Sequence, residues 1–458
     1  MVVFNIMKLL PLIFIFTLFS SVSCTDNSSA TIGTENPTYT DEELMTQVQQ
    51  DAFNYFWDWA NPNSKLARER YLVENPSFEA NIVTTGGSGF GLMTILVGVE
   101  RGFVSRTEAV SRLTTALHFL ETANRFHGAW PHWINGTTGE VIPFGTVDNG
   151  GDLVETAFLC QGLLTVREYF KNGDASEQAL AQKADELWKG VEWNWYTKGE
   201  NVLYWHWSPN YEWQLNHKIQ GYDECLITYI MAAASPTHPI TPEVYQHGWA
   251  RNGAIVSTGS KYDFPLVLNH NGAPGNVGPM FWAHYSFLGL DPRGLTDQYA
   301  NYWDLTKNHT EIMYSYCVIN PQGWTGYNEK CWGLTASYTR NSDGSTGYAA
   351  HQPNNDKGVI SPTAALSSFP YKPDAAMHFL RFLYEEKKNQ YVGFAGPYDA
   401  FSPKFNWVTQ RYLAIDQGTI APMIENHRTG LLWNLFMQAP EIQNGLQNLG
   451  FSSTQHGF

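Results

Sequence analysis

The chain has 458 residues and a formal net charge of −15, and only 16% of its residues are charged. This acidic balance excludes the basic surface with which proteins bind nucleic acids, and it makes polyanions poor ligands. Aromatic residues reach 15% and include 17 Trp. Because the C–H faces of sugar rings stack on indole and phenol rings, this excess favours a neutral carbohydrate ligand, although a large core also uses many Trp side chains.

The first 24 residues have the layout of a signal peptide. Lys8 precedes the apolar run 9–19, and small residues then lead to Cys24. The run is shorter than the roughly 20 residues that a membrane-spanning helix needs. We expect cleavage and lipidation at Cys24, so that the exported chain is held at the outer membrane, on its periplasmic or cell-surface face, by the lipid alone. The alternative is an ordinary signal peptide with an incidental Cys, because Ser21 stands where such motifs usually carry Leu.

Residues 25–40 are rich in Ser, Thr and Asn and have no apolar periodicity, which predicts a flexible tether. The remaining residues, 41–458, contain no second linker of this kind. We therefore expect one catalytic domain, and we expect it to be a monomer.

Amphipathic stretches of helix length recur along this domain, and several begin with capping residues. Ser105 with Glu108 fits a capping box. Thr241 and Ser361 each precede a proline and fit an N-cap followed by Pro in the first turn. The predicted helices are 41–60, 88–101, 105–123, 151–171, 176–196, 223–234, 241–253, 280–288, 296–318, 361–367, 373–387 and 416–438.

About twelve helices, few strand patterns and no internal repeat predict an all-α fold in which six helical hairpins close into an (α/α)6 toroid. The structural alternative, a helical solenoid, normally shows a repeat period. In the toroid all inner helices begin at the same end of the barrel, so their N-terminal residues meet at one mouth. The long aromatic and Gly-rich connections are expected to form a binding surface there.

The first group of candidate carboxyls surrounds the predicted helix 151–171. Asp152 and Glu155 stand three residues apart, and Asp148 precedes them. Residues at this spacing share one helix face, yet Asp152 as N-cap with Glu155 at the third position also fits a capping box. Both interpretations stay open, because a helix N-terminus at the mouth of the barrel serves either role.

Two further acidic residues begin predicted helices. Asp223 fits an N-cap and leaves Glu224 free, and Asp416 fits the N-cap of helix 416–438. Glycoside hydrolysis needs two carboxyl groups in different protonation states, one to protonate the leaving oxygen and one to activate water or to attack. Helix dipoles favour the charged form and packing against Trp rings favours the neutral acid. The acid should therefore be the most desolvated carboxyl.

Aromatic and imidazole side chains surround these carboxyls in the sequence. At least half of them are expected to be structural. The candidates for sugar contact are Trp130, His132, Trp205, Trp207 and Trp213. The Gly-rich segment 86–91 superficially resembles a phosphate loop, but no strand pattern precedes it, which favours a Gly-rich turn in the active site.

No HExxH zinc motif, GxSxG motif or Walker loop occurs in the sequence, and the 14 His show no ligand spacing. We therefore expect neither a metal nor a cofactor. Besides Cys24 there are four cysteines. Cys160 and Cys225 fit buried thiols, whereas Cys317 and Cys331 fit either a disulfide or two separate thiols.

Four short segments, taken together in this order, carry a resemblance to a known family. They are 84–91 (Thr-Thr-Gly-Gly-Ser-Gly-Phe-Gly), 148–155 (Asp-Asn-Gly-Gly-Asp-Leu-Val-Glu), 221–224 (Gly-Tyr-Asp-Glu) and 412–418 (Tyr-Leu-Ala-Ile-Asp-Gln-Gly). They resemble the glucoamylase-like helical family that includes glycoside hydrolase family 144, the β-1,2-glucanases. The resemblance extends over residues 44–449.

This resemblance implies an (α/α)6 barrel, hydrolysis of β-1,2-linked glucan with inversion, and no required cofactor. By position, it implies that Glu155, Glu224 and Asp416 are the essential carboxyls and that Asp148 and Asp152 line the same pocket. Which carboxyl is the acid and which is the base stays open. In an inverting enzyme the two carboxyls lie about 6.5–9.5 Å apart, which leaves room for water.

Three functions are distinguishable at this point. The leading hypothesis is an inverting β-1,2-glucan hydrolase, which cuts either within the chain or from one end with release of sophorose-type oligosaccharides. A non-catalytic glycan-binding lipoprotein of a polysaccharide-uptake system would also be exported, helical and Trp-rich, but it has no use for converging acids. A polysaccharide lyase needs a basic cleft for uronic acids, which the acidic balance disfavours.

Overall fold

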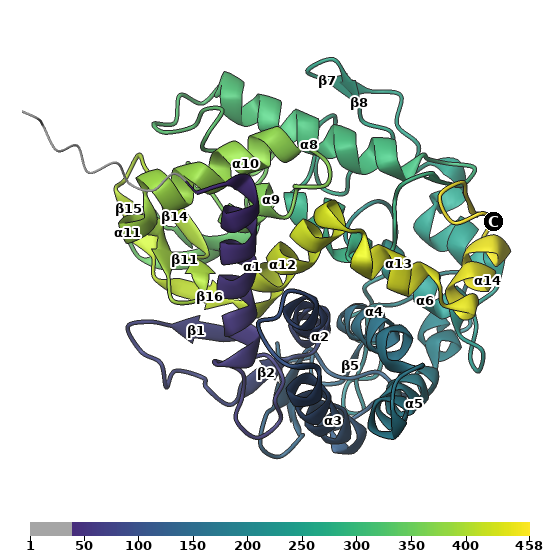
Figure 1. The fold of residues 1–458 in the computed structure, drawn as a ribbon. Coiled ribbons are helices and arrows are strands. Elements are labelled where there is room, and N and C mark those ends of the chain that lie inside the picture. Colours follow the sequence, from purple (N-terminus) through teal and green to yellow (C-terminus); the bar gives the residue numbers. More distant parts are fainter. Residues whose placement is uncertain (1–38) are drawn as a thin grey trace, which may run out of the picture. The chain divides into compact units, whose positions relative to one another are not determined.

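The computed structural model describes residues 39–458. The predicted signal peptide, the candidate lipidation site Cys24 and nearly all of the predicted tether lie outside the described residues. Within the described part the fold is mainly helical (Figure 1). The α-helices are α1 (Asp41–Trp57), α2 (Thr85–Glu100), α3 (Arg106–Thr122), α4 (Leu153–Phe170), α5 (Ala175–Lys189), α6 (Leu226–Ala234), α7 (Pro242–Val244), α8 (Tyr302–Ile319), α9 (Pro362–Leu366), α10 (Pro373–Arg381), α11 (Lys388–Tyr391), α12 (Ala414–Arg428), α13 (Leu431–Met437) and α14 (Pro440–Asn448).

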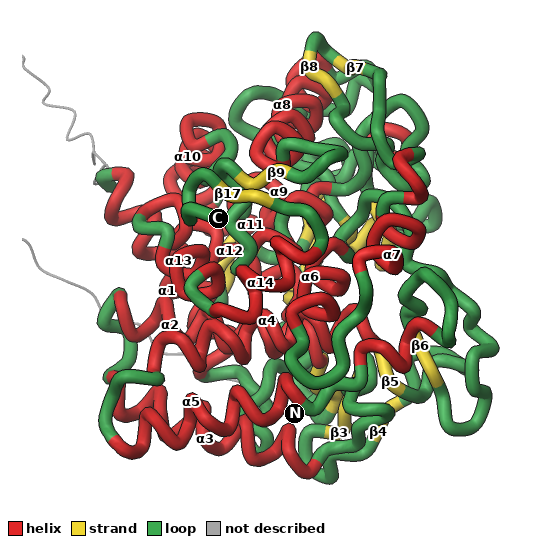
Figure 2. The backbone as a smooth tube through the Cα atoms, turned by 90° about the vertical axis from the view of Figure 1, so that its right-hand side faces the viewer, coloured by secondary structure: helices red, strands yellow, loops and turns green. Residues whose placement is uncertain are grey.

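Short antiparallel ribbons occupy the connections between helices. Figure 2 shows β3 to β6 among long loops at one end of the helices. The pairs are β1 (Arg70–Leu72) with β16 (Arg411–Leu413), β2 (Ile82–Thr84) with β3 (Trp133–Asn135), β3 with β4 (Val141–Ile142), β5 (Gly151–Asp152) with β6 (His206–Trp207), β7 (Ser260–Lys261) with β8 (Phe264–Pro265), β9 (Leu295–Thr296) with β17 (Ser452–Ser453), β10 (Ala336–Arg340) with β11 (Thr346–Ala350), β12 (Val392–Gly393) with β13 (Gly396–Pro397), and β14 (Ala400–Ser402) with β15 (Trp407–Thr409).

The helices alternate between inner and outer positions. α2 packs against α4 and α12, and α4 also packs against α6, whereas α3 and α5 cover α2 and α4 from outside (Figure 1). The inner helix α4 is buried along nearly its whole length, and α5 buries one face only. An all-round apolar helix must be enclosed, while an amphipathic helix covers it. This is the inner and outer pairing of the predicted toroid.

Glycines allow the inner helices α2 and α4 to approach closely. A Cβ on Gly89 would lie 2.4 Å from the carbonyl oxygen of Phe158, and a Cβ on Gly162 would lie 2.3 Å from the carbonyl oxygen of Gly89. The segment 86–91 therefore forms the first turns of α2, and the predicted active-site turn is wrong. Gly89 and Gly91 serve helix packing, which a local sequence pattern does not distinguish from loop flexibility.

Helix boundaries follow the capping residues in some places and not in others. Ser105 and Glu108 form the predicted capping box at the start of α3. The predicted helix 416–438 is interrupted at Gly430, whose φ of +72° ends α12 and begins α13. The predicted helix 280–288 consists of two short 3₁₀ turns.

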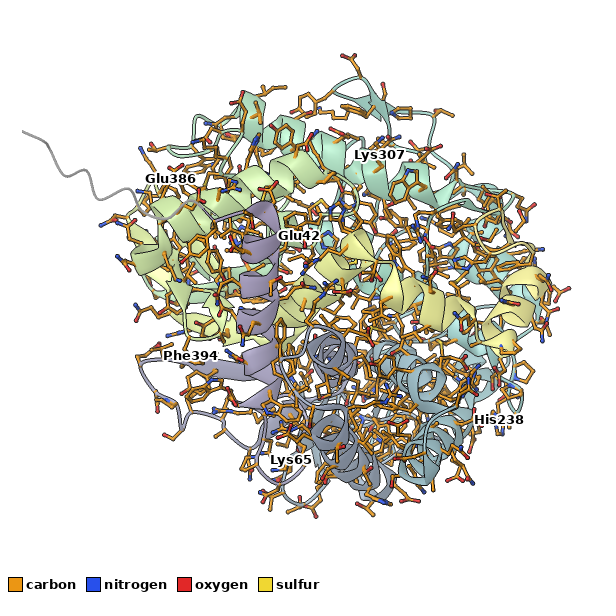
Figure 3. The ribbon with its side chains drawn as sticks, viewed as in Figure 1. Glu42, Lys65, His238, Lys307, Glu386 and Phe394 are labelled. Atoms are coloured by element: carbon orange, nitrogen blue, oxygen red, sulfur yellow. The ribbon has the colours of Figure 1, made fainter. Side chains whose placement is uncertain are left out.

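Most charged side chains of the described residues lie at the surface. Glu42, Lys307 and Glu386, which Figure 3 labels, are exposed, while side chains fill the space between the helices. The four described cysteines, including Cys317 and Cys331, are separate buried thiols. None of the helices within residues 39–458 has both the length and the apolar character needed to span a membrane.

Candidate active site

A cavity of about 370 Å³ opens where inner helices begin. The N-terminal ends of α2, α4 and α12 and the segment before α6 all reach it, as the toroid predicts. Its lining residues are Glu69, Arg70, Thr84, His132, Trp133, Phe144, Glu155, Phe158, Trp205, Glu224, Phe281, Tyr285, Ala336, Tyr338, Tyr348, Leu413 and Ile415. Apolar and aromatic walls with a few converging charged groups are typical of a small-molecule or oligosaccharide site.

Asp152 caps α4 and thereby frees Glu155. Asp152 Oδ1 accepts hydrogen bonds from the backbone N–H groups of Val154 (3.0 Å) and Glu155 (2.9 Å). The Glu155 side chain does not turn back to complete a capping box. Its Oε2 instead accepts the N–H of Gly86 at 2.7 Å and the hydroxyl of Thr84 at 3.4 Å. The N-cap prediction for Asp152 is confirmed, and Glu155 is available to the cavity.

His132 links these two carboxyls. Its Nδ1 lies 3.0 Å from Asp152 Oδ2, and its Nε2 lies 4.0 Å from Glu155 Oε1. Asp152 Oδ2 also accepts the indole N–H of Trp205 at 3.0 Å. Burial lowers the pKa of His132, but the charge of Glu155 and the bond with Asp152 outweigh it and raise this pKa to about 9. His132 is therefore an imidazolium at neutral pH.

Glu224 lies in a different electrostatic environment. Its neighbour Asp223 accepts hydrogen bonds from the backbone N–H of Cys225 (2.9 Å) and from Asn271 Nδ2 (2.9 Å). Burial, followed by the charges of Asp223 and Glu155, raises the pKa of Glu224 well above its ordinary value. Helix α6 begins at Leu226 with Cys225 as N-cap, so the prediction that Asp223 is the N-cap is wrong, although its carboxylate does accept a backbone N–H there.

Asp416 lies behind the cavity wall. It is the third residue of α12, whose N-cap is Leu413, so the predicted N-cap role is wrong. The Tyr285 hydroxyl, on the cavity wall, donates to Asp416 Oδ1 at 3.3 Å. Asp416 itself is 3% exposed and is absent from the cavity lining. Asp416 therefore does not line the cavity but contacts a residue of its wall, Tyr285.

The other predicted site residues lie on the cavity wall, behind this wall or in the core. His132 and Trp205 line the cavity, and Asp152 supports both from behind. Asp148 lies outside the wall, where its Oδ1 is 3.3 Å from His206 Nε2. Burial and the charge of Asp152 raise the pKa of Asp148 to about 7.

Three of the predicted Trp residues do not line the cavity. Trp130 is 0% exposed, and its indole N–H donates to the Leu120 carbonyl at 3.0 Å, so it is a core residue. Trp207 and Trp213 pack with Trp195 in a separate aromatic group. None of the three lines this cavity, so the cavity does not support their predicted sugar contacts. The prediction could not give their side-chain directions, because these depend on strand pairing that sequence spacing does not reveal.

The prediction also missed several wall residues. Glu69 and Arg70 form an ion pair at the start of β1, and Tyr338 and Tyr348 come from the hairpin of β10 and β11. Phe281 and Tyr285 come from irregular 3₁₀ turns. The predicted helix 280–288 contains Phe281 and Tyr285 but did not mark them as cavity residues, and for the other wall residues only the long connections indicated a binding surface.

Two groups of side chains within residues 39–458 have a spacing that a metal ion would accept. They are His132 with Asp148 and Asp152, and Asp223 with Glu224 and Cys225. In the first group the carboxylate of Asp152 is already engaged by His132 and Trp205. In the second, burial raises the pKa of the Cys225 thiol, which opposes the thiolate that metals bind.

Known proteins resemble this chain in sequence and in architecture. The Glycoamylase family model, described as "Putative glucoamylase", matches residues 216–440. The endo-beta-1,2-glucanase from Chitinophaga pinensis, solved in complex with sophorotriose and glucose, is 54% identical with a TM-score of 0.88, over 91% of this chain and 99% of that chain. The chain belongs to glycoside hydrolase family 144.

Two other proteins also resemble this family 144 chain. The exo beta-1,2-glucooligosaccharide sophorohydrolase (non-reducing end) of Parabacteroides distasonis is 44% identical, and the match covers 92% of this chain but 60% of that protein. The family 144 chain thus spans about three fifths of the length of this curated relative. An endo-beta-1,2-glucanase from Talaromyces funiculosus shares the fold at 13% identity, with a TM-score of 0.62. The predicted family and the all-α toroid are confirmed.

Proposed function

We propose that the chain hydrolyses linear β-1,2-glucan, with Glu224 as the general acid and Glu155 as the general base. The observation that carries this proposal is the contrast between these two carboxyls on one cavity wall. Glu155 has a cation and two hydrogen-bond donors, whereas Glu224 has carboxyls as its charged neighbours. Pairs of carboxyls whose environments separate their pKa values are the basis of acid and base assignment in glycosidases.

Glu224 suits the acid because its surroundings raise its pKa and favour the protonated form. Burial and the neighbouring negative charge of Asp223 both disfavour its ionised form. A neutral carboxyl at the cavity wall can donate its proton to the glycosidic oxygen as the bond to the leaving sugar breaks. The expectation that the most desolvated carboxyl is the acid does not single out Glu224, because Glu155 and Asp416 are less exposed than Glu224.

Glu155 suits the base because it combines burial with a fixed countercharge. Burial raises its pKa, and the imidazolium of His132 together with the N–H of Gly86 opposes this rise. A base whose pKa lies near the working pH is efficient, because it is ionised and still accepts a proton. Its Oε2 is engaged by Gly86 and Thr84, which leaves Oε1 for a water molecule. Attack by that water inverts the anomeric centre.

The names of the relatives support the proposed linkage and cutting mode. The Chitinophaga enzyme is named an endo-acting β-1,2-glucanase and is matched over 99% of its length, whereas the exo-acting sophorohydrolase is matched over 60%. We therefore propose cleavage within the glucan chain. Neutral sugar rings also suit an aromatic cavity in an acidic protein.

Product analysis on linear β-1,2-glucan tests the reaction. Glu224→Gln and Glu155→Gln should each lower kcat by about 100-fold or more, whereas the exposed Glu140→Gln serves as control and should not. Proton NMR of the first products should show the α-anomer, as inversion requires. Full activity in both site variants would overturn the assignment, and binding of neutral glucans without any turnover would favour a glycan-binding protein instead.

Product size tests the cutting mode. Endo cleavage should release a range of oligosaccharides early in the reaction, with a rapid fall in the mean length of the glucan. Sophorose as the sole early product would replace the endo proposal by exo cleavage. Unsaturated products that absorb ultraviolet light would replace hydrolysis by a lyase reaction.

We further propose that the chain is an exported, monomeric lipoprotein whose membrane contact is the lipid on Cys24. The support is the order of Lys8, the apolar run 9–19 and the small residues before Cys24. Metabolic labelling with a radioactive fatty acid should mark the wild type, and Cys24→Ala should abolish the label and release the protein to the soluble fraction. An unlabelled wild type in a membrane-free fraction would leave an ordinary signal peptide as the explanation.

A further inference from the structure

Two buried carboxyls meet behind the cavity wall. Asp399, between β13 and β14, is 4% exposed, and Asp416, in the first turn of α12, is 3% exposed. Both line a small cavity of about 10 Å³, which is barely the space of one water molecule. Within residues 39–458 no hydrogen-bond donor reaches Asp399 Oδ1 or Asp416 Oδ2. The Oε1 of Gln417, on the same cavity, also lacks a donor.

A proton between the two carboxyls would satisfy these orphaned oxygens. Ionised carboxylates only accept hydrogen bonds, and two like charges enclosed together are strongly unfavourable. The remaining oxygens are satisfied, because Asp399 Oδ2 accepts the backbone N–H of Tyr338 at 2.7 Å and Asp416 Oδ1 accepts the Tyr285 hydroxyl at 3.3 Å. A single proton on the pair turns two orphaned acceptors into one hydrogen bond.

The charged surroundings favour the same protonation state. Burial raises the pKa of Asp399 to about 6, and the hydrogen bonds from Asp416 and Tyr338 and the charge of Arg70 limit this rise. Burial and the proximity of Asp399 raise the pKa of Asp416 well above its ordinary value. Glu69 adds negative charge near both. These titrations belong to the pair, and both shifts agree with one proton on the pair at neutral pH.

We propose that Asp399 is a positioning residue for Asp416, and that the two carboxyls share one proton so that the remaining charge holds the Tyr285 hydroxyl in a fixed orientation at the cavity wall. Because this hydroxyl donates its hydrogen to Asp416, its lone pairs face outward. Tyr285 then offers an acceptor, and no donor, to a sugar hydroxyl or to water in the cavity. The effect of this device on catalysis rests on the proposed function.

The pair also gives the site a defined response to acid. As the pH falls through about 6, the pair takes up its second proton and loses its charge. Tyr285 then loses its anionic acceptor, and its hydroxyl is free to rotate. The acid limb of the kcat profile should therefore contain the titration of Asp399 with Asp416, in addition to that of Glu155.

The first experiment needs no substrate. The full chain is labelled with ¹³C at the aspartate carboxyls, and the titrations are compared in the wild type, Asp399→Asn and Asp416→Asn. Proton sharing predicts reciprocity: removal of either carboxyl shifts the titration of the other by at least one pH unit. Titrations that stay unchanged when the partner is removed would overturn the proposal, whether or not the chain is a glucanase.

The second experiment measures turnover of β-1,2-glucan against pH. Asp399→Asn keeps an acceptor for the Tyr338 N–H and a donor for Asp416 but removes the shared titration. It should move the acid limb of kcat by at least one unit and change KM less than twofold. Asp297→Asn is the matched control, because Asp297 accepts the hydroxyls of Tyr245 (2.6 Å) and Tyr302 (3.2 Å) away from the cavity. The control should keep the wild-type profile.

A profile of Asp399→Asn that superimposes on that of the wild type would overturn the positioning role. If Asp399→Asn does not fold, Tyr285→Phe replaces it, because this variant cuts the link to the cavity and keeps both carboxyls, although Asp416 Oδ1 loses its donor. It should remove the contribution of the pair to the acid limb. Reciprocal titration without turnover in any variant would retain proton sharing and refute the proposed function.

Discussion

The backbone N–H of Gly86 donates to Glu155 Oε2 across 2.7 Å, so the first turn of one inner helix positions the carboxylate of the next. A Cβ on residue 86 would lie 2.6 Å from the same oxygen. Gly86→Ala should therefore displace Glu155 and lower kcat by about 10- to 100-fold, since small misplacements of a catalytic group are costly.

Steady-state kinetics on β-1,2-glucan checks this expectation. Gly145→Ala is the matched control, because its added Cβ would meet only the Asp148 Cβ, at 3.8 Å. Equal kcat values in Gly86→Ala and Gly145→Ala would show that the hydrogen bond from Gly86 does not position Glu155.

Trp205 combines two roles that substitutions can separate. Its ring lines the cavity, and its indole N–H donates to Asp152. Trp205→Phe keeps an aromatic wall and loses the donor, whereas Trp205→Ala loses both. We expect KM for glucan to rise about tenfold in Trp205→Ala and much less in Trp205→Phe, because stacking supplies the binding contact. Equal KM changes in the two variants would assign the whole effect to the bond with Asp152.

The charge on His132 should make stability depend on alkaline pH. Its pKa is raised from 6.5 to about 9 in the folded chain, so the folded state binds this proton more tightly than the unfolded state. The stabilisation is complete below pH 6.5 and is lost as the pH rises through about 9. The difference in Tm between the wild type and His132→Gln should be largest near pH 6 and smaller near pH 9.5. Calorimetry at both pH values measures it, and a constant difference would show that the imidazole stays neutral.

Buried neutral histidines should limit stability in acid. Burial lowers the pKa of His309 and His351 to about 4 and that of His284 to about 3. The unfolded chain protonates these rings near 6.5, so the free energy of unfolding falls as the pH drops from about 6.5 towards 4, by about 1.4 kcal/mol per pH unit for each ring. His309→Gln should flatten this dependence in urea titrations, and an unchanged slope would contradict the neutral state of His309.

The convergence of carboxyls was predictable because it follows from local patterns. Capping residues and amphipathic periods locate the starts of helices, and a toroid brings those starts together. Whether Glu155 caps its own helix was not predictable, because the answer depends on the N–H of Gly86 from another helix. Spacing within one segment does not contain that contact.

The position of Asp416 could not be predicted from the local sequence either. Its place near a helix start is local information, but its burial behind Tyr285 depends on an irregular turn far away in the sequence. Asp399 carried no signal either, since it belongs to a short connection without periodicity. Tertiary contacts between distant segments decide which carboxyl faces the cavity and which supports it.

The ribbon in which Arg70 pairs with Leu413 joins an early segment of the chain to a late one at the cavity wall. Arg70 lacks this partner until β16 has been synthesised. Contacts between such distant segments slow folding, because the intervening chain must be ordered first. A nascent chain that stops short of Arg411–Leu413 would thus hold most of its helices and no complete site, which gives a built-in delay between synthesis and the first turnover.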